Sequence, residues 1–311
     1  MQKNMGNIGR SIILFVMLFA CAVARAADIV AQDEILPESS QAESGKQQGN
    51  DKSDCDKRSP ISTYKINYFA LNNLPNNDNA QVKFQLSVKY KFFNRDLSVE
   101  GHPLALYLAY SQISLWNVGQ SSKPFEESNY NPEAFLNYSA NITRGPVTLR
   151  DIILSPYEHE SNGLEGPQSR SWNRIYAAVR MGYLPIREQC DNDSTQKDHV
   201  ELKVKVWHAY GYSDQDAYLQ SIGSSNTFLD YEGYGEVNVA LRDILVQGDW
   251  GNRIDMTSKI GGKQNFEFQY QQKIPSLNFT PYFQYWYGYN ETLLRFDRFG
   301  RRAFLGVSFV Y

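Results

Sequence analysis

The sequence predicts an all-β protein, a twelve-stranded antiparallel transmembrane β-barrel, and three observations support this. The 311 residues include 21 Tyr, 17 Phe and 5 Trp, and aromatic residues favour strands. From Asn67 onward, short segments of alternating polarity are separated by clusters of Asn, Asp, Gly, Pro and Ser, which is the period-two signal of strands joined by turns. Finally, no segment has a sustained helical period.

The N-terminal residues predict export. Lys3 and Arg10 precede the apolar run 11–24, and a small-residue cleavage pattern follows it at 24–26. We therefore expect residues 1–26 to be a signal peptide. No other apolar run is long enough to cross a membrane as a helix, which excludes a helical membrane protein and disfavours a cytoplasmic enzyme.

The charge distribution excludes one further class of partner. The chain has 31 Lys and Arg against 34 Asp and Glu, a net charge of −3, so no broad basic field indicates binding to nucleic acid. Residues 27–62 are polar and nearly free of aromatic side chains. They bury too little apolar surface to offset the entropy of ordering, so we expect a mobile periplasmic tail before a barrel of residues 63–311.

The chain has three cysteines. Cys21 lies inside the expected signal peptide, where Phe19 fits a lipoprotein cleavage box poorly. Cys55 and Cys190 remain in the exported chain, and the compartment would permit a disulfide. The spacing of the two residues does not decide between a disulfide and two free thiols.

The strand predictions follow the alternating segments. The even number of segments suits a closed antiparallel barrel. The segments are 65–73, 81–93, 102–116, 132–143, 147–161, 169–182, 199–211, 228–240, 242–252, 263–273, 278–289 and 301–311.

The two faces of the strands favour a membrane barrel over an exported β-sandwich. One face of 263–273 carries Phe266 and Phe268, and the opposite face carries Glu267 and Gln269. The polar face is unsuited to a sandwich core but suits a hydrogen-bonded barrel lumen. The chain also ends in an alternating strand with a terminal aromatic residue, which resembles the assembly signal of outer-membrane barrels.

The most informative window for chemistry is 157–174. His159 and Ser161 are two residues apart and therefore share one face of a strand. A hairpin symmetric about Gly166 would place His159 opposite Asn173, with Cβ atoms about 5 Å apart. Asn173 could then orient the imidazole, completing the third position that a Ser–His pair requires.

The parity of the next strand predicts where these residues point. Asn173 shares its face with the apolar Ile175, whereas the opposite face carries arginines. We therefore expect Ser161, His159 and Asn173 on the lipid-facing wall, at the rim in the outer leaflet. By the same count Asp151 should face outward near the inner rim, where a charge is tolerated.

A polar, hydrogen-bonded porin rim would also explain these residues. A His-x-Ser pair alone is common, and the cross-strand asparagine and the lipid-facing parity are what favour catalysis. The chain has no G-x-S-x-G elbow around Ser161, which excludes an α/β-hydrolase as the host of this serine.

This window resembles the outer-membrane phospholipase A family, the calcium-dependent lipolytic barrels of Gram-negative envelopes. The similarity is carried by His159-Glu160-Ser161-Asn162-Gly163 and by Ser169-Arg170-Ser171-Trp172-Asn173-Arg174. Weaker similarity extends over 82–87, 124–132 and 148–151. The resemblance implies a phospholipase A1 and A2 activity in which Ser161 is the nucleophile, His159 the general base and Asn173 the residue that orients it.

The resemblance also implies a calcium ion near the oxyanion. Its ligands would be the hydroxyl of Ser169 and the backbone carbonyl of Leu164, with Ser122 contributing from a second subunit. This chain has Leu at 164 where the family commonly has Arg, so any contact of the arginine side chain is lost while a carbonyl ligand is retained. Oxygen ligands suit calcium, and the ion would supply positive charge where the tetrahedral intermediate becomes negative.

Gln112 is a candidate contact residue for self-association. It continues the parity of Leu104, Leu106 and Leu108, which places an amide on the lipid face, where an unpaired polar group is costly. A matching glutamine across a two-fold homodimer would satisfy it, and the resemblance likewise implies activation by dimerisation. Alternatively, Gln112 reaches the polar interface of the membrane.

The remaining histidines have no assigned role. His102, His199 and His208 are scattered, without the spacing of a zinc site. We therefore expect an integral outer-membrane serine hydrolase that cleaves phospholipid acyl esters as a calcium-bound homodimer. The alternative is a non-catalytic outer-membrane barrel, either a porin or an inactive relative.

Overall fold

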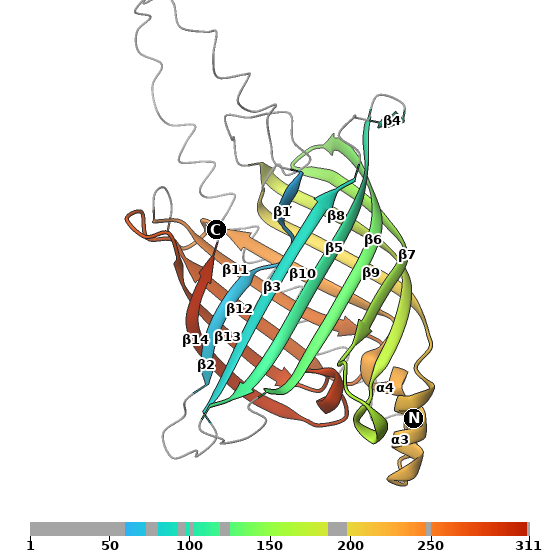
Figure 1. Cartoon of the computed structure of the whole chain (residues 1–311). Coiled ribbons are helices and arrows are strands. Elements are labelled where there is room, and N and C mark those ends of the chain that lie inside the picture. Colours follow the sequence, from blue (N-terminus) through green and yellow to red (C-terminus); the bar gives the residue numbers. More distant parts are fainter. Residues whose placement is uncertain are drawn as a thin grey trace, which may run out of the picture.

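The structure is a computed structural model that describes residues 60–72, 80–92, 97–99, 102–118, 125–185, 198–246 and 250–309. Within these residues fourteen strands form one antiparallel sheet, and pairing of β3 with β5 closes it into a ring of twelve (Figure 1). Two short strands are not counted in the ring: β1 (Ile61–Thr63) pairs with β3, and β4 (Leu97–Val99) pairs with β5. The twelve-stranded barrel predicted from the sequence is confirmed.

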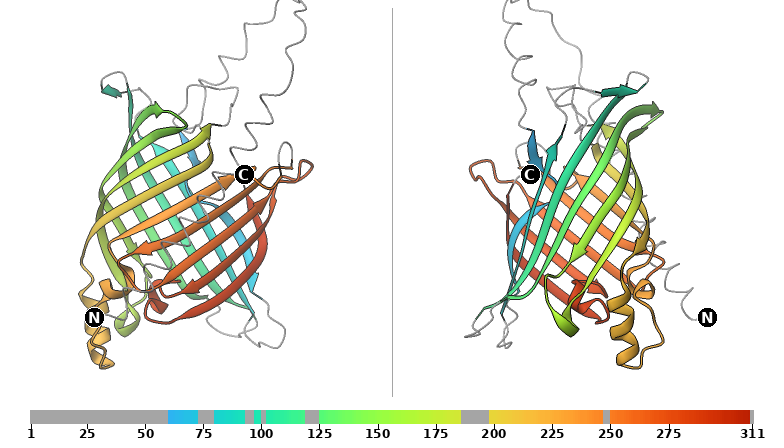
Figure 2. Two further views of the ribbon diagram at one scale, coloured as in Figure 1. Left: turned by 180° about the vertical axis from the view of Figure 1, so that it is seen from behind. Right: turned by 45° about the vertical axis from the view of Figure 1, so that its right-hand side comes forward.

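The barrel strands run in sequence order around the ring and are strongly tilted (Figure 2). They are β2 (Asn67–Asn72), β3 (Gln81–Lys91), β5 (His102–Asn117), β6 (Phe125–Arg144), β7 (Val147–Ser161), β8 (Ser171–Pro185), β9 (Asp198–Tyr210), β10 (Gly235–Arg242), β11 (Asn252–Ile260), β12 (Asn265–Gln272), β13 (Thr280–Gly288) and β14 (Gly300–Phe309).

The outer wall is apolar and the lumen is polar, which is the pattern of a transmembrane barrel. Leu154, Ile175 and Leu305 are among the exposed large side chains of the wall. In β12 the predicted polar face does line the lumen, where the carboxylate of Glu267 accepts hydrogen bonds from neighbouring glutamines. Among the described residues, no helix is long and apolar enough to cross a membrane.

Buried ion pairs fill part of the lumen. Arg150 Nε donates to Asp198 at 2.8 Å, and Arg180 bridges Asp151 and Glu201. Charges removed from water need such partners, because an unpaired charge in a low-dielectric interior is strongly unfavourable.

Asp151 therefore faces the lumen, and the expectation that it faces outward is wrong. The sequence count assumed an uninterrupted strand, but β7 has register shifts between Leu149 and Asp151 and between Ser155 and Glu158. Only the shift between Ser155 and Glu158 lies between His159 and Asp151; it adds one residue to β7 and reverses the alternation beyond it. The parity of His159 consequently does not extend to Asp151.

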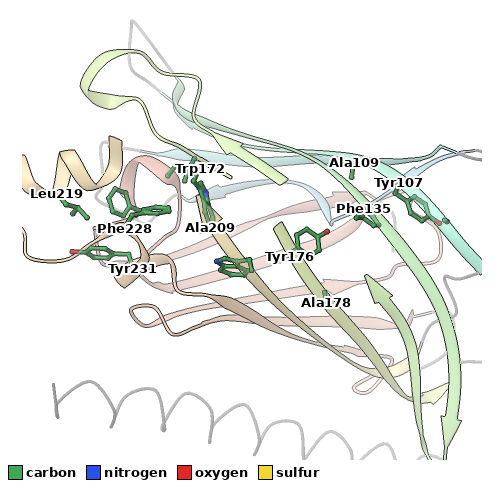
Figure 3. Packing of buried hydrophobic residues seen from close by; sticks show 14 residues of the cluster. Tyr107, Ala109, Phe135, Trp172, Tyr176, Ala178, Ala209, Leu219, Phe228 and Tyr231 are labelled. Atoms are coloured by element: carbon green, nitrogen blue, oxygen red, sulfur yellow. The ribbon is translucent and has the colours of Figure 1, made fainter. Parts of the chain in front are cut away.

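An aromatic cluster lies inside the barrel and extends to the end at which β7 meets β8 (Figure 3). Helices α3 (Ser213–Ser221) and α4 (Phe228–Glu232) connect β9 to β10 and supply part of it, and the 3-10 helix η3 (Leu293–Arg295) supplies another part. Phe228 packs edge-on against Trp172, with ring centroids 5.3 Å apart. The cluster supports the inner side of the wall whose outer side carries Ser161 and His159.

Two strand predictions need correction in this region. Residues 228–232, expected to begin a strand, form α4, because Thr227 and Asp230 make a capping box and Gly233 ends the helix at a φ of 74°. The helix occupies a single turn, which is too short to display a helical period.

In the predicted strand 242–252, the described residues 243–246, 250 and 251 are not part of a strand. Asp243 has a left-handed φ of 55°, and the Asn252 side-chain oxygen accepts the backbone N–H groups of Leu245 and Val246. Side-chain capping of the backbone outweighs the strand propensity of the apolar residues here. The strand β11 begins at Asn252, where the prediction ended.

Gly182 provides a test of the lumen packing. A Cβ atom at this position would lie 1.9 Å from the Oδ2 atom of Asp198, which pairs with Arg150. Because breaking a buried pair costs about 3–5 kcal/mol, Gly182→Ala should lower the free energy of unfolding by about 3 kcal/mol. Urea unfolding of the refolded barrel in detergent measures this.

Gly300→Ala is the matched control. A Cβ at Gly300 meets its nearest neighbour at 3.7 Å, an ordinary contact. Equal stability of the two variants would contradict the proposed role of Gly182.

Candidate functional site

The site lies on the β7–β8 hairpin, at the barrel end that carries α3 and α4 (Figures 1 and 2). The strands pair His159 with Asn173 and Ser161 with Ser171. This is the register expected from a hairpin symmetric about Gly166. Local turn geometry therefore determines which side chains meet across the two strands.

The imidazole of His159 is held by the amide of Asn173. His159 Nδ1 lies 2.9 Å from the Asn173 side-chain oxygen. Since that oxygen can only accept, the bond calls for a proton on Nδ1 and leaves Nε2 as the basic nitrogen. Ser161 is half-buried on the same face of β7, two residues along the strand.

The neighbours of this pair are apolar or aromatic and face outward. Tyr157 stacks parallel to His159 with ring centroids 6.4 Å apart, and Ile175 is exposed beyond Asn173. The triad candidates thus stand on the lipid-facing wall. An ester reaching them would come from the membrane side and not from the lumen.

The inner side of the same strands carries a polar clamp. Glu158 and Glu160, which flank His159, bond to the side chains that flank Asn173: Arg174 reaches Glu158 at 2.6 Å, and Trp172 Nε1 donates to Glu160 at 3.2 Å. Lys205 from β9 adds a second cation at 2.7 Å from Glu158. These inner bonds hold the two strands in the register that the outer pair needs.

A short loop joins the strands and is fastened by Asn162. Its side-chain oxygen accepts the N–H groups of Leu164 and Arg170, and its Nδ2 donates to the carbonyl of Gln168 at 2.8 Å. Gly163 has a left-handed φ of 63°, and a Cβ there would lie 2.7 Å from the Tyr130 ring. The fastening was missed from the sequence, although an Asn-Gly pair after a strand is a turn signal.

Helix α3 supports this loop from the lumen side. The Arg170 guanidinium lies 4.2 Å from the centroid of the Tyr218 ring, and Gln215 Nε2 donates to the Ser171 carbonyl at 2.8 Å. Neither helical residue was singled out in the sequence, because α3 is separated from the loop by the whole of β8 and β9.

The loop residues present are compatible with calcium. Ser169 offers a hydroxyl and Leu164 a carbonyl, and Asn162 fixes the backbone between them. These are hard oxygen donors of the kind that calcium prefers. They are also neutral, and no group of three or more His, Cys, Asp or Glu in the described residues could hold a metal ion. Water or a second chain would have to complete the coordination shell.

Gln112 lies on the outer wall of β5, next to β6. Its side-chain oxygen accepts from the Tyr110 hydroxyl at 3.0 Å, and its Nε2 donates to Ser114 at 3.1 Å. Part of its hydrogen-bonding capacity is therefore satisfied within one chain. Nε2 has a second N–H that an acceptor outside the chain could use.

The other residues singled out in the sequence lie apart from the site or beyond the described ranges. Ser122, Cys21, Cys55 and Cys190 lie outside the described residues, as do residues 1–59. His199 Nδ1 is 2.9 Å from the Arg242 carbonyl, and His208 is exposed on the outer wall.

The loop conformation can be tested through Arg170, a buried residue that trypsin would recognise. Asn162→Ala removes three hydrogen bonds worth about 0.5–1.5 kcal/mol each, so the loop should open at least about tenfold more often. The rate of tryptic cleavage after Arg170 should rise accordingly. Asn226→Ala, which alters the α3–α4 connection, serves as the control; equal cleavage rates would contradict the role of Asn162.

Comparison with known proteins identifies the family. The family described as phospholipase A1 matches residues 51–309. The phospholipase A1 of Proteus vulgaris is 33% identical over 188 residues, which are 55% of this chain and 62% of that protein. The phospholipase A1 of Klebsiella pneumoniae is 34% identical over 138 residues, 44% of this chain and 42% of that protein. The chain thus spans less than two thirds of the length of these curated relatives.

Solved structures share the barrel fold. The outer membrane phospholipase A from Escherichia coli superposes with a TM-score of 0.63 at 23% identity, covering 83% of this chain and 96% of that one. The outer membrane phospholipase dimer of Salmonella typhi with bound calcium gives 0.64 at 23% identity, covering 85% and 99%. The present chain shares the closed β-barrel fold of these outer membrane proteins. Because the family match extends over most of its length, it belongs to the phospholipase A1 family.

Proposed function

We propose that this barrel hydrolyses acyl esters of phospholipids in the outer leaflet, as a phospholipase A1 and A2, with Ser161, His159 and Asn173 as its catalytic triad. The observation that carries the proposal is the 2.9 Å contact between His159 Nδ1 and the Asn173 oxygen on the lipid-facing wall. Family membership and relatives named phospholipase A1 support the same chemistry.

The proposed reaction begins with Ser161. Its Oγ attacks the ester carbonyl carbon as His159 Nε2 takes the hydroxyl proton. The Asn173 side-chain oxygen accepts a hydrogen bond from the Nδ1–H group, which stays protonated, so the lone pair of Nε2 is free for this step. His159 then returns the proton to the departing alcohol oxygen of the lysophospholipid, and the acyl group remains on Ser161.

Hydrolysis of the acyl-enzyme completes the cycle. His159 Nε2 takes a proton from water, the hydroxide oxygen attacks the acyl carbon, and the fatty acid leaves as Ser161 regains its proton. Asn173 is neutral, so it orients the ring without the charge stabilisation that an aspartate would give to the imidazolium.

The proposed metal is calcium. Ser169 and the Leu164 carbonyl would hold it together with Ser122 of a second subunit, and the bound ion supplies positive charge beside the developing oxyanion. A relative described as a dimer with bound calcium supports this assignment. In this proposal the active form is a homodimer, because one ligand comes from the second chain.

A non-catalytic porin is the alternative function. The aromatic cluster that includes Trp172 and Phe228, and the ion pairs between Arg150 and Asp198 and around Arg180, occupy the lumen. A barrel filled in this way is poorly suited to solute passage. An inactive relative would share this filling and differs from the proposed enzyme only in turnover.

The first test is hydrolysis of a micellar phospholipid by refolded protein with calcium. Ser161→Ala removes the proposed nucleophile, so the rate should fall at least about 10³-fold while the heat-modifiable migration of the barrel is unchanged. A chelator should also abolish turnover of the unmutated chain.

The outcomes separate the parts of the proposal. Turnover that survives chelation would retain the triad and contradict the calcium assignment. Absence of turnover from a folded, dimeric, calcium-loaded barrel, or conductance unaffected by Ser161→Ala, would favour the non-catalytic alternative.

The dimer is tested through Gln112. If its amide pairs with that of a second chain in the membrane, Gln112→Ala should weaken the dimer in detergent by about 0.5–2 kcal/mol. Sedimentation equilibrium with calcium measures the dissociation constant. Leu305→Ala, on the lipid-facing wall of β14, is the control. An unchanged constant for Gln112→Ala would exclude this contact.

A further inference from the structure

Strand β7 contains one extra residue just before His159. Against β8, Ser155 pairs with Tyr176 and Glu158 with Arg174, so three steps on β7 match two on its neighbour. Against β6, Leu154 pairs with Leu136 and Tyr157 with Ala134, with the same mismatch. Both sides therefore define a β-bulge at 155–157.

The bulge determines which way the proposed catalytic pair faces. Leu154 and Tyr157 are 52% and 45% exposed on the outer wall although they are an odd number of residues apart. In an uninterrupted strand that continued from Leu154, Glu158 would face lipid and His159 would face the lumen. Because of the extra residue, His159 faces lipid and Glu158 faces the lumen.

The hydroxyl of Ser155 holds the bulge. Ser155 is buried, and its Oγ lies 2.8 Å from the Ala134 carbonyl oxygen and 3.0 Å from the carbonyl oxygen of Tyr157. The same Oγ accepts the Tyr157 N–H at 3.3 Å. Pro156 is exposed and has no N–H to leave unpaired, which suits a bulge position.

The inner clamp keeps the bulge in its place. If the extra residue moved beyond His159, Glu158 would leave both Arg174 and Lys205, which lie 2.6 and 2.7 Å from its carboxylate oxygens. Lys205 would then lose this carboxylate, and Arg174 would retain only Glu160, at 3.2 Å. The clamp thus fixes the far side of the bulge, and Ser155 fixes its interior.

We propose that the Ser155–Pro156 bulge is the device that turns His159 and Ser161 to the membrane, and that Ser155 is a positioning residue for the reaction. This inference rests on the proposed function for its catalytic consequence but not for its geometry. Loss of the hydroxyl loosens the segment that carries His159 without touching the lipid-binding wall, so it should lower kcat and leave KM nearly unchanged.

The geometry is tested without activity. In a chain with Cys21→Ser, Cys55→Ser and Cys190→Ser, a nitroxide is attached at Ile153→Cys, Leu154→Cys or Tyr157→Cys before refolding into lipid. Both the 154 and 157 labels should collide with lipid-dissolved oxygen, and the 153 label should not. A 157 label that is shielded from oxygen would overturn the bulge.

The positioning role is tested by Ser155→Ala and Ser155→Thr. We expect kcat to fall about tenfold to a hundredfold in the alanine variant, since displacement of a reacting group by about 1 Å has such effects, with KM within about twofold. Threonine retains the hydroxyl and should restore kcat. Ser258→Ala, which removes a similar 2.8 Å bond from a hydroxyl to the Asn265 carbonyl on distant strands, should change neither value.

A second readout separates the inference from the proposed function. Ser155→Ala should raise the mobility of the 157 label, and Ser258→Ala should not. Unchanged kcat in Ser155→Ala would overturn the positioning role. If the unmutated barrel hydrolyses nothing, the proposed function fails, and increased mobility of the 157 label would still support the structural role of Ser155.

Discussion

The pairing of β7 with β8 is the interaction on which the candidate site depends. The outer side of this hairpin brings the oxygen of Asn173 to His159, and the inner side brings Arg174 to Glu158. The two sets of bonds belong to adjacent residues of the same strands, so a register slip would break both. A wall one strand thick can therefore hold a polar pair toward lipid because it is anchored from the lumen.

The filled lumen gives this wall its rigidity. Trp172 and Arg174 precede and follow the lipid-facing Asn173 and pack inward, with the Arg174 guanidinium 4.0 Å from the centroid of the Trp172 ring. Phe228 of α4 packs edge-on against Trp172. A pore needs space where these side chains lie, whereas a site on the outer wall benefits from a closely packed backing.

The accuracy of the sequence predictions depended on whether the interactions involved are local or distant in the sequence. The β7–β8 register could be predicted because a short loop with Gly166 sets it locally, and the lumen face of β12 followed from simple alternation. The orientation of Asp151 could not, since bulges interrupt alternation without a distinct composition. The contact of Tyr218 with Arg170 depends on side chains distant in sequence, which no local pattern reports, and the single turn of α4 is too short to display a helical period.

The neutral donor set links the proposed metal to the proposed assembly. Ser169 and Leu164 offer oxygens without formal charge, and calcium normally takes six to eight oxygen ligands, often including carboxylates. One chain alone would therefore bind the ion weakly, and a hydroxyl from a second chain would add a ligand, with water supplying the rest of the shell. By linkage, if dimerisation raises the calcium affinity by a given factor, calcium raises the affinity of the dimer by the same factor. In the proposed function, a donor set without a carboxylate would make calcium binding and dimerisation depend on each other, and the monomer would be inactive.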